Sequence, residues 1–330
     1  MPPLNGGVET DMKKYVCFLL IFLFLLAQGV MPGVLANKEE NLPANPFKDT
    51  ASGKWFTEGI LWCYKYGYMS GTGDEVFSPD AVLSRAMFVQ ILYTADLADE
   101  KYSKSSFFDV DTGKWYFNAA EWAYKSGYTS GTGNGYFSPD SPVTREQLAL
   151  FLYNYAKSKG AKLTASSSLS KFSDRAKISS WAKTAVSWAV AEGFLAGTGD
   201  NMISPKAGAS RAQSAVVISQ FLKKYGIQWD DGKIITQRTC KVDGVIEYHA
   251  LDKSGRTMRV TLKAWHNYGY GKVTKAATCT AAGIKTFTCS VCKSTRTESI
   301  KATGHKWDSG KVTKPATCTA AGVKTFTCSV

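Results

Sequence analysis

The stretch Gly71-Thr-Gly-Asp-Glu-Val-Phe-Ser-Pro-Asp80, followed closely by Ser84-Arg85, occurs in three versions along this chain. The second version spans residues 131–140 and the third spans residues 197–206, and each is again followed by a hydroxyl residue and an arginine. A pattern of this length that recurs indicates a repeat protein. One copy is too small to bury its own apolar face, so we expect the three copies to pack together as one domain.

Each copy is expected to fold as helix, loop and helix. The first helix should end at a glycine, which readily takes the left-handed conformation that terminates helices. The second helix should begin after a serine or threonine that caps its free N–H groups, and a glutamine three residues later completes a capping box in two of the copies. The terminating glycines are Gly67, Gly127 and Gly193, the caps are Ser84, Thr144 and Ser210, and the glutamines are Gln147 and Gln213.

An arginine stands in the first turn of each second helix, at Arg85, Arg145 and Arg211. The positive end of the helix dipole disfavours a cation there. Free N–H groups and a guanidinium together form a site for an anion, which would explain the position. Alternatively, each arginine pairs with the carboxylate at the start of its own repeat, which is Asp49, Asp109 or Asp174. The residues alone leave both explanations open.

The combined pattern of Phe-x-Asp, Trp, Gly-Tyr, Gly-Thr-Gly-Asp, Phe-x-Pro and Thr-Arg resembles the S-layer homology (SLH) domain over about residues 46–226. The resemblance implies a pseudo-threefold, mainly helical bundle with grooves between the copies. It also implies that the grooves bind an anionic secondary cell-wall polymer, usually pyruvylated, that is linked to peptidoglycan. The polymer-binding residues that it implies are Arg85, Arg145, Arg211, Asp49, Asp109, Asp174, Trp55, Trp115, Trp181, Gly71, Gly131 and Gly197.

The copies depart from the family pattern in the helix-start motif. That motif reads Ser-Arg-Ala-Met, Thr-Arg-Glu-Gln and Ser-Arg-Ala-Gln, so none has the family's glutamate at the fourth position. The third copy also has Ile203 in place of the aromatic residue and Lys206 in place of the aspartate. We therefore expect the first two copies to be better ligand sites than the third. Trp62, Trp122 and Trp188 are expected in the core.

Residues 1–36 are typical of a secretory signal peptide. Lys13 and Lys14 precede an apolar run, and small residues up to Ala36 suit a signal peptidase. The apolar run is shorter than the roughly 20 residues that span a bilayer, so no stable membrane span is expected after cleavage. Met12 would give a more ordinary start to this leader. The protein is therefore expected to be secreted to the bacterial cell wall or surface.

The charge is concentrated in the tail. Residues 37–226 carry 21 basic and 18 acidic side chains, whereas residues 227–330 carry 17 basic and 7 acidic ones. A basic surface favours anionic partners such as wall polymers, lipid headgroups or nucleic acid. Export and the lack of an aromatic and basic stripe argue against nucleic acid. A lysine-rich solvated surface explains the charge equally well.

Residues 227–330 form a second set of repeats with a period of 39 residues. Residues 271–291 and 310–330 are nearly identical, and an earlier degenerate copy has Ala250 and Lys253 where the later one has Cys289 and Cys292. Alternating apolar and polar residues between glycines predict short strands. The pattern breaks off within a copy at Val330, so we expect the natural protein to be longer. These copies loosely resemble cysteine-bearing repeats of Firmicutes surface proteins.

Six of the eight cysteines lie at or after Cys240. The residues Cys279, Cys289, Cys292 and His305 supply four ligands of the type that a structural Zn²⁺ takes, with His266 as the alternative fourth ligand. Export into an oxidising space favours disulfides instead. Three cysteines in each full copy leave one unpaired, which tips the prediction towards zinc. Apart from this structural Zn²⁺, no cofactor is expected.

The sequence thus predicts a mainly α protein, with a pseudo-threefold bundle of helix-loop-helix repeats followed by small β-rich cysteine repeats. The predicted segments are a signal peptide at 1–36, SLH repeats at 46–101, 105–160 and 170–226, and tail repeats over 227–330. The predicted function is non-covalent anchoring to the cell wall, with the tail displayed outward and no catalytic residues. The alternative is a wall-anchored polysaccharide or peptidoglycan hydrolase whose catalytic domain lies beyond Val330.

Overall fold

A computed structural model describes residues 42–330 of the chain. The predicted signal peptide, including Met12, lies outside the described residues. Within the part that is described, no helix is long and apolar enough to cross a membrane.

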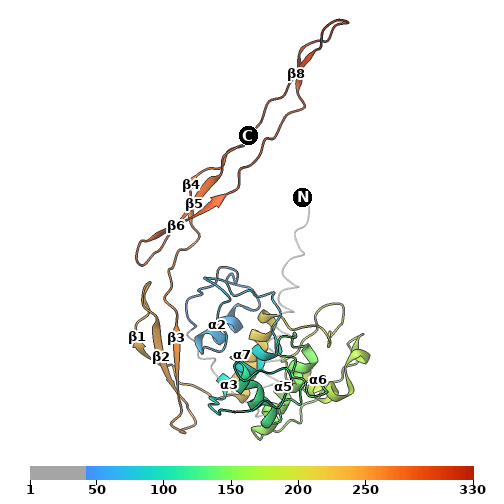
Figure 1. The fold of residues 1–330 in the computed structure, drawn as a ribbon, viewed down its shortest axis with the longest axis vertical. Coiled ribbons are helices and arrows are strands. Elements are labelled where there is room, and N and C mark those ends of the chain that lie inside the picture. The colour runs from blue at the N-terminus through green and yellow to red at the C-terminus, as the bar shows by residue number, and fades with distance from the viewer. Residues whose placement is uncertain (1–41) are drawn as a thin grey trace, which may run out of the picture. The chain divides into compact units, whose positions relative to one another are not determined.

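The first part of the described chain is helical (Figure 1). Each repeat contributes two helices, as the sequence predicts, and the third repeat adds two short 3₁₀ turns before its first helix. The elements are α2 (Thr57–Lys65), α3 (Arg85–Ala95), α4 (Phe117–Lys125), α5 (Arg145–Ser158), η1 (Arg175–Lys177), η2 (Ser180–Ala182), α6 (Lys183–Ala191) and α7 (Arg211–Tyr225).

The predicted helix signals are confirmed at both ends. The hydroxyls of Ser84, Thr144 and Ser210 each accept the N–H three residues on, and complete capping boxes occur at Thr144 and Ser210. The three terminating glycines follow α2, α4 and α6 with positive φ angles of 69°, 75° and 79°. These signals are local, so the sequence is sufficient to read them.

The three repeats close into a ring of contacts. Helix α3 of the first repeat packs on α4 of the second, α5 of the second packs on α6 of the third, and α7 of the third returns to α2 of the first. The second helices also meet in one shared core, where the Phe88 and Phe151 rings lie 5.4 Å apart and Tyr155 contacts Phe221. Each pair of repeats is thus joined in the same way, which is the arrangement of a pseudo-threefold bundle.

The second part, from residue 227, is made of small antiparallel sheets (Figure 1). The first sheet has the order β1-β2-β3, the second has the order β4-β5-β6, and the third pairs β7 with β8. An irregularity at the same place in the first strand of each sheet marks them as copies of one unit. The strands are β1 (Lys233–Thr236), β2 (Gly244–His249), β3 (Thr257–Leu262), β4 (Lys272–Lys275), β5 (Gly283–Thr288), β6 (Thr295–Ile300), β7 (Lys311–Lys314) and β8 (Val323–Thr325).

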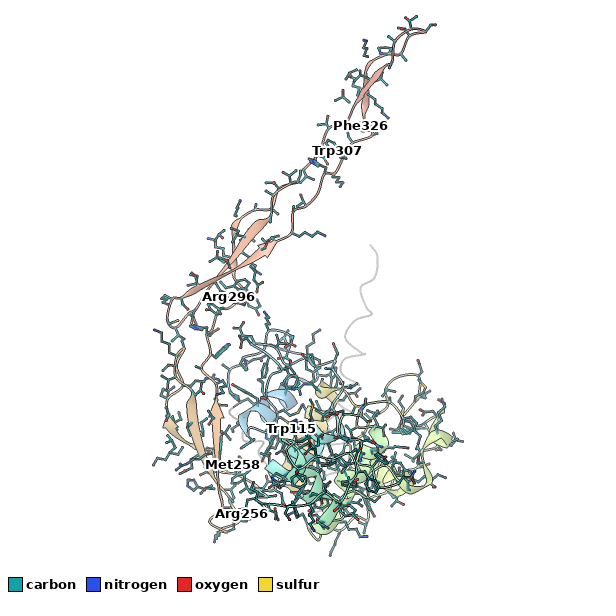
Figure 2. All side chains as sticks on the ribbon, viewed as in Figure 1. Trp115, Arg256, Met258, Arg296, Trp307 and Phe326 are labelled. Carbon is teal, nitrogen blue, oxygen red and sulfur yellow. The ribbon has the colours of Figure 1, made fainter. Side chains whose placement is uncertain are left out.

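The first sheet shares the core of the helical part. Tyr248 on β2 and Met258 on β3 are buried in the same apolar cluster as the helices. The indole N–H of Trp229 donates to the hydroxyl of Tyr68 across 3.1 Å. By contrast, Trp307 and Phe326 of the third tail copy are about half exposed (Figure 2). Apolar burial therefore supports the first tail copy much better than the last.

The predicted class, mainly α, is wrong for this chain. Helices account for 25% of the structure and strands for 19%. The reason is twofold: the repeat helices are short and separated by long loops, and the tail folds entirely into strands and turns. The chain has a helical part and a β part.

Candidate functional site: the grooves between repeats

Each glycine-rich loop is held by the aspartate at the start of its own repeat. In the second repeat, the carboxylate of Asp109 accepts the backbone N–H groups of Phe137 at 2.8 Å and Ser138 at 2.7 Å. Ser138 has a positive φ of 57°, which this pair of bonds stabilises. Asp49 and Asp174 hold the loops of the first and third repeats in the same way. The three aspartates therefore shape the loops.

The glycines that open these loops allow a close backbone crossing. A Cβ atom on Gly131 would lie 2.3 Å from the carbonyl oxygen of Tyr136, and on Gly71 it would lie 2.7 Å from that of Val76. Gly197 is less tight, with 3.1 Å to the carbonyl oxygen of Met202. Any larger residue would open the first two loops, so these glycines have a structural role in forming the groove wall.

The three arginines reach from one repeat into the next. The Nε atom of Arg85 donates to the carbonyl of Phe137, that of Arg145 to Ile203, and that of Arg211 to Phe77. The first repeat thus reaches the second, the second reaches the third, and the third returns to the first. Neither of the two alternatives drawn from the sequence describes this contact, because each arginine binds a backbone carbonyl of another repeat.

Burial and nearby carboxylates set the charge of these arginines. Burial lowers the pKa of Arg85 to about 10, against the opposing effect of Asp109. Burial likewise lowers the pKa of Arg145 and of Arg211, against the opposing effects of Asp174 and Asp49. A guanidinium with a pKa of about 10 remains a cation at neutral pH. The carboxylate that faces each arginine belongs to the repeat that the arginine reaches.

Arg85 differs from the other two in its terminal nitrogens. An Nη2 atom of Arg145 donates to the carbonyl of Ala196, and that of Arg211 donates to the carbonyl of Ser70. The corresponding atom of Arg85 is buried and has no hydrogen-bond partner among the described residues. An unpartnered charged donor is costly to bury. The rings of Phe137 and Phe151 flank this guanidinium, with their centres 4.8 Å and 5.4 Å from its central carbon.

The Arg85 groove is a cavity of about 400 Å³ that draws on all three repeats. The first repeat supplies Arg85, the second supplies the loop from Ser130 to Gly133 and the amide of Gln147, and the third supplies Trp181. Trp181 is 51% exposed, so its ring face is accessible. A cation, backbone and amide donors, and an exposed aromatic ring can together bind an acidic sugar.

The other tryptophans of the repeats fall into an exposed set and a buried set. Trp55 and Trp115 occupy the positions equivalent to Trp181 and are also exposed. Trp62, Trp122 and Trp188 are buried in the core, which confirms that prediction. Trp115, one of the exposed set, lies on the helical part of the chain (Figure 2).

The groove beside Gly71 is bordered by the tail. A cavity of about 800 Å³ is lined on one side by residues 70–75 and on the other by Trp265, His266 and Arg296. Arg296 forms an ion pair of 3.2 Å with Glu75 of the loop. Tail residues therefore line this groove, whereas the residues that line the Arg85 groove all come from the repeats.

The resemblance implies grooves between the copies, but the sequence does not show which repeats line each groove. Lys206 of the third repeat illustrates the point: it pairs with the buried carboxylate of Glu146 in the second repeat and lies 5.9 Å from the ring centre of Trp181. Ranking the three copies one at a time as ligand sites therefore does not rank the grooves, because the residues around a groove come from more than one copy. Sequence reasoning also missed Gln147 as a groove residue; its place in the first turn of the helix, three residues after the cap Thr144, was the available signal.

The predicted zinc ligands fall into two clusters instead of one. Cys289 and Cys292 lie with Cys240 and His266, whereas Cys279 and His305 lie with Cys328. The predicted set of Cys279, Cys289, Cys292 and His305 is therefore not brought together; the alternative histidine, His266, is the one beside the Cys-x-x-Cys pair. The hairpin turn that carries this pair folds back towards the preceding copy, a contact that spacing alone does not reveal.

Comparisons with known proteins find three matches, each of which spans the first helix of a repeat and ends within the second helix. The S-layer homology domain model matches residues 46–87, 106–149 and 171–215. The chain is 31% identical over 217 residues to an endoglucanase of Bacillus sp. (strain KSM-635), covering 65% of this chain and 22% of that protein. It is 28% identical over 230 residues to the surface-layer 125 kDa protein of Lysinibacillus sphaericus, covering 66% and 19%.

A cellulosome-anchoring protein of Acetivibrio thermocellus is 24% identical over 161 residues, covering 48% of this chain and 36% of that protein. The aligned parts thus amount to well under half of the length of each of these relatives. What is shared is a module that occurs in enzymes, surface-layer proteins and anchoring proteins alike.

Proposed function

Because the chain carries three S-layer homology domains and is a cell-surface protein of that family, we propose that residues 42–226 bind an anionic secondary cell-wall polymer and so hold the protein on the wall. The observation that carries the proposal is the buried, unpartnered Nη2 atom of Arg85 beside a cavity that an aromatic ring and a glycine loop complete. A carboxylate on a sugar, such as a pyruvyl ketal, fits this donor set in charge and size.

The polymer is held by a division of roles. Arg85 supplies the fixed positive charge and a free donor, Gln147 and the loop from Ser130 to Gly133 supply neutral polar groups, and Trp181 supplies a stacking face. Arg145 and Arg211 are committed to carbonyls between repeats and mainly join the ring. The Arg85 groove is therefore the principal site.

The experiment is sedimentation of the purified protein with isolated cell walls. Three wall samples are compared: intact walls, walls from which the secondary polymer has been extracted, and walls treated with mild acid to hydrolyse pyruvyl ketals. Binding to intact walls that is lost in both treated samples supports the proposal. Equal binding to extracted walls would overturn it, and loss only on extraction would show that the anion is not a ketal.

A second candidate function follows from the relatives that are named as enzymes. In the endoglucanase, the aligned part covers 22% of the protein. The anchor would then hold a polysaccharide hydrolase on the wall, with the described residues as its non-catalytic part. Assays of the protein released from its native cell walls on cellulose, xylan and peptidoglycan, beside the same assays of the purified chain, test this: hydrolysis by the released protein alone supports the second candidate, and hydrolysis by neither contradicts it.

A further inference from the structure

We infer that the tail binds structural Zn²⁺ at the joints between consecutive copies, with Cys240, His266, Cys289 and Cys292 as the ligands of the first joint. The ligand atoms of these four residues lie within 4.8 Å of one another. Three thiols and one imidazole form one of the standard ligand sets of structural zinc sites.

The four ligands come from three different segments. Cys240 lies in the loop between β1 and β2 of the first sheet, His266 lies in the linker between the first and second sheets, and the Cys289 and Cys292 pair lies in the turn between β5 and β6 of the second sheet. A metal ion bound here would tie one copy to the next, because no single copy holds a full set.

The spacing of the sulfur atoms suits a metal better than a disulfide. The Sγ atoms of Cys240 and Cys289 are 3.6 Å apart, and Sγ of Cys292 is 3.2 Å from Nδ1 of His266. Two sulfurs bound to one tetrahedral Zn²⁺ at about 2.3 Å lie about 3.8 Å apart, whereas bonded sulfurs are about 2.05 Å apart. Cys289 is fully buried, which shields the centre of the cluster.

The second joint repeats the arrangement one period later. Cys279, His305 and Cys328 lie within 4.8 Å of one another, and the Sγ atoms of Cys279 and Cys328 are 3.5 Å apart. These residues are the counterparts of Cys240, His266 and Cys289. The counterpart of Cys292 is the position directly after Val330, so the chain as given supplies three ligands at this joint.

The backbone of the joints is also repeated. The N–H of Ser290 donates to the carbonyl of Asn267 at 2.8 Å, and the N–H of Ser329 donates to that of Lys306 at 2.9 Å. Each bond ties the Cys-x-x-Cys turn to the linker that carries the histidine. These bonds hold the cysteine-bearing turn close to the histidine at both joints.

The hairpin of the first tail copy has the same backbone bond but lacks the cysteine pair. The same bond occurs there, from Leu251 to Gln228 at 2.9 Å, but Ala250 and Lys253 replace the cysteine pair. This copy follows the helical part and is held by apolar packing, including Trp229 and Tyr248. Cysteines and histidine therefore occur where one tail copy meets another, and apolar burial serves where a tail copy meets the helices.

The test begins with the unmodified purified protein. Metal analysis after gel filtration should give about one tightly held zinc per chain, since one described cluster has a full set of four ligands. Cobalt substitution should give the near-ultraviolet sulfur-to-metal absorption of a thiolate site. Peptide mapping that finds Cys240 disulfide-bonded to Cys289, with no metal bound, would overturn the inference.

Variants then locate the ligands. Cys240→Ser and His266→Ala should each abolish zinc retention, whereas Cys318→Ser should leave it unchanged, because Cys318 is exposed and belongs to neither cluster. Zinc retained in Cys240→Ser but lost in Cys279→Ser would contradict this ligand set. Adding one cysteine directly after Val330 should raise the zinc content to about two per chain; an unchanged content would contradict the repeated joint.

A separate experiment tests whether the zinc stabilises the joint between tail copies. Chelation should open the linker at residues 263–271 to proteolysis, while binding of the same sample to cell walls should not change. The wall assay shows that the helical part is still folded, so failure of the zinc inference and failure of the anchor proposal are distinguishable.

Discussion

Arg85, Arg145 and Arg211 occupy equivalent positions and yet differ in the bonds that remain free. All three are buried and all three donate Nε to a carbonyl of another repeat. Only Arg85, among the described arginines of this motif, has a buried terminal nitrogen without a hydrogen-bond partner. This difference supports the proposal that Arg85 binds the ligand, while Arg145 and Arg211 mainly join the repeats.

Asp109 gives a prediction at the scale of one residue. Asp109→Ala should lower the free energy of unfolding by about 2–3 kcal/mol, because two backbone N–H groups, one of them on buried Phe137, lose a charged acceptor. Denaturant unfolding measures the change. Asp140→Ala is the control, since Asp140 is exposed in the same repeat; equal effects of the two substitutions would contradict the role of Asp109.

The six helices of the repeats are the elements that the sequence predicts best. Their caps and terminating glycines depend on residues within one turn, and the structure has them where the sequence predicts them. The contacts of Arg85 with Phe137, and the split of the cysteines into two clusters, could not be predicted in this way. They join residues 49 or more positions apart, and no local rule fixes which distant segment approaches.

Helix α3 offers a prediction at the scale of one element. Its cap, Ser84, has no reciprocal partner because Met87 stands where α5 and α7 have a glutamine. Met87 is 40% exposed, so Met87→Gln should complete the capping box without disturbing the core and stabilise the protein by about 0.5 kcal/mol. Thermal unfolding should show a small rise in Tm. Gln213→Met in α7 is the reciprocal change and should lower Tm; a fall with Met87→Gln would contradict the capping explanation.

At the scale of the whole molecule, the ring of repeats makes the grooves a shared property. The Arg85 groove needs the first repeat for its cation, the second for its loop and the third for Trp181. The sequence predicts a pseudo-threefold bundle but does not show which repeats line each groove. It also underestimates the strands of the tail, which led to the wrong fold class. Both features depend on how separate segments assemble.

The ring predicts that the repeats cannot be removed one at a time. A chain lacking residues 170–226 should lose the contacts of α7 with α2 and of α6 with α5. It should therefore no longer bind cell walls and should no longer unfold in one cooperative transition. Circular dichroism during heating and wall sedimentation measure the two effects. A cooperative, wall-binding product of this deletion would show that the repeats act independently.

The most direct test of the anchor is the affinity of Arg85→Gln for isolated cell walls, with Arg175→Gln as the matched control on an exposed arginine of the same module. Glutamine can still donate towards the carbonyl of Phe137, so the fold should be kept while the charge is lost. Removing a charge-assisted bond worth about 1.5–3 kcal/mol should weaken wall binding about tenfold or more. The control should bind as the unmodified protein does. Unchanged wall binding by a folded Arg85→Gln protein would contradict the proposed site.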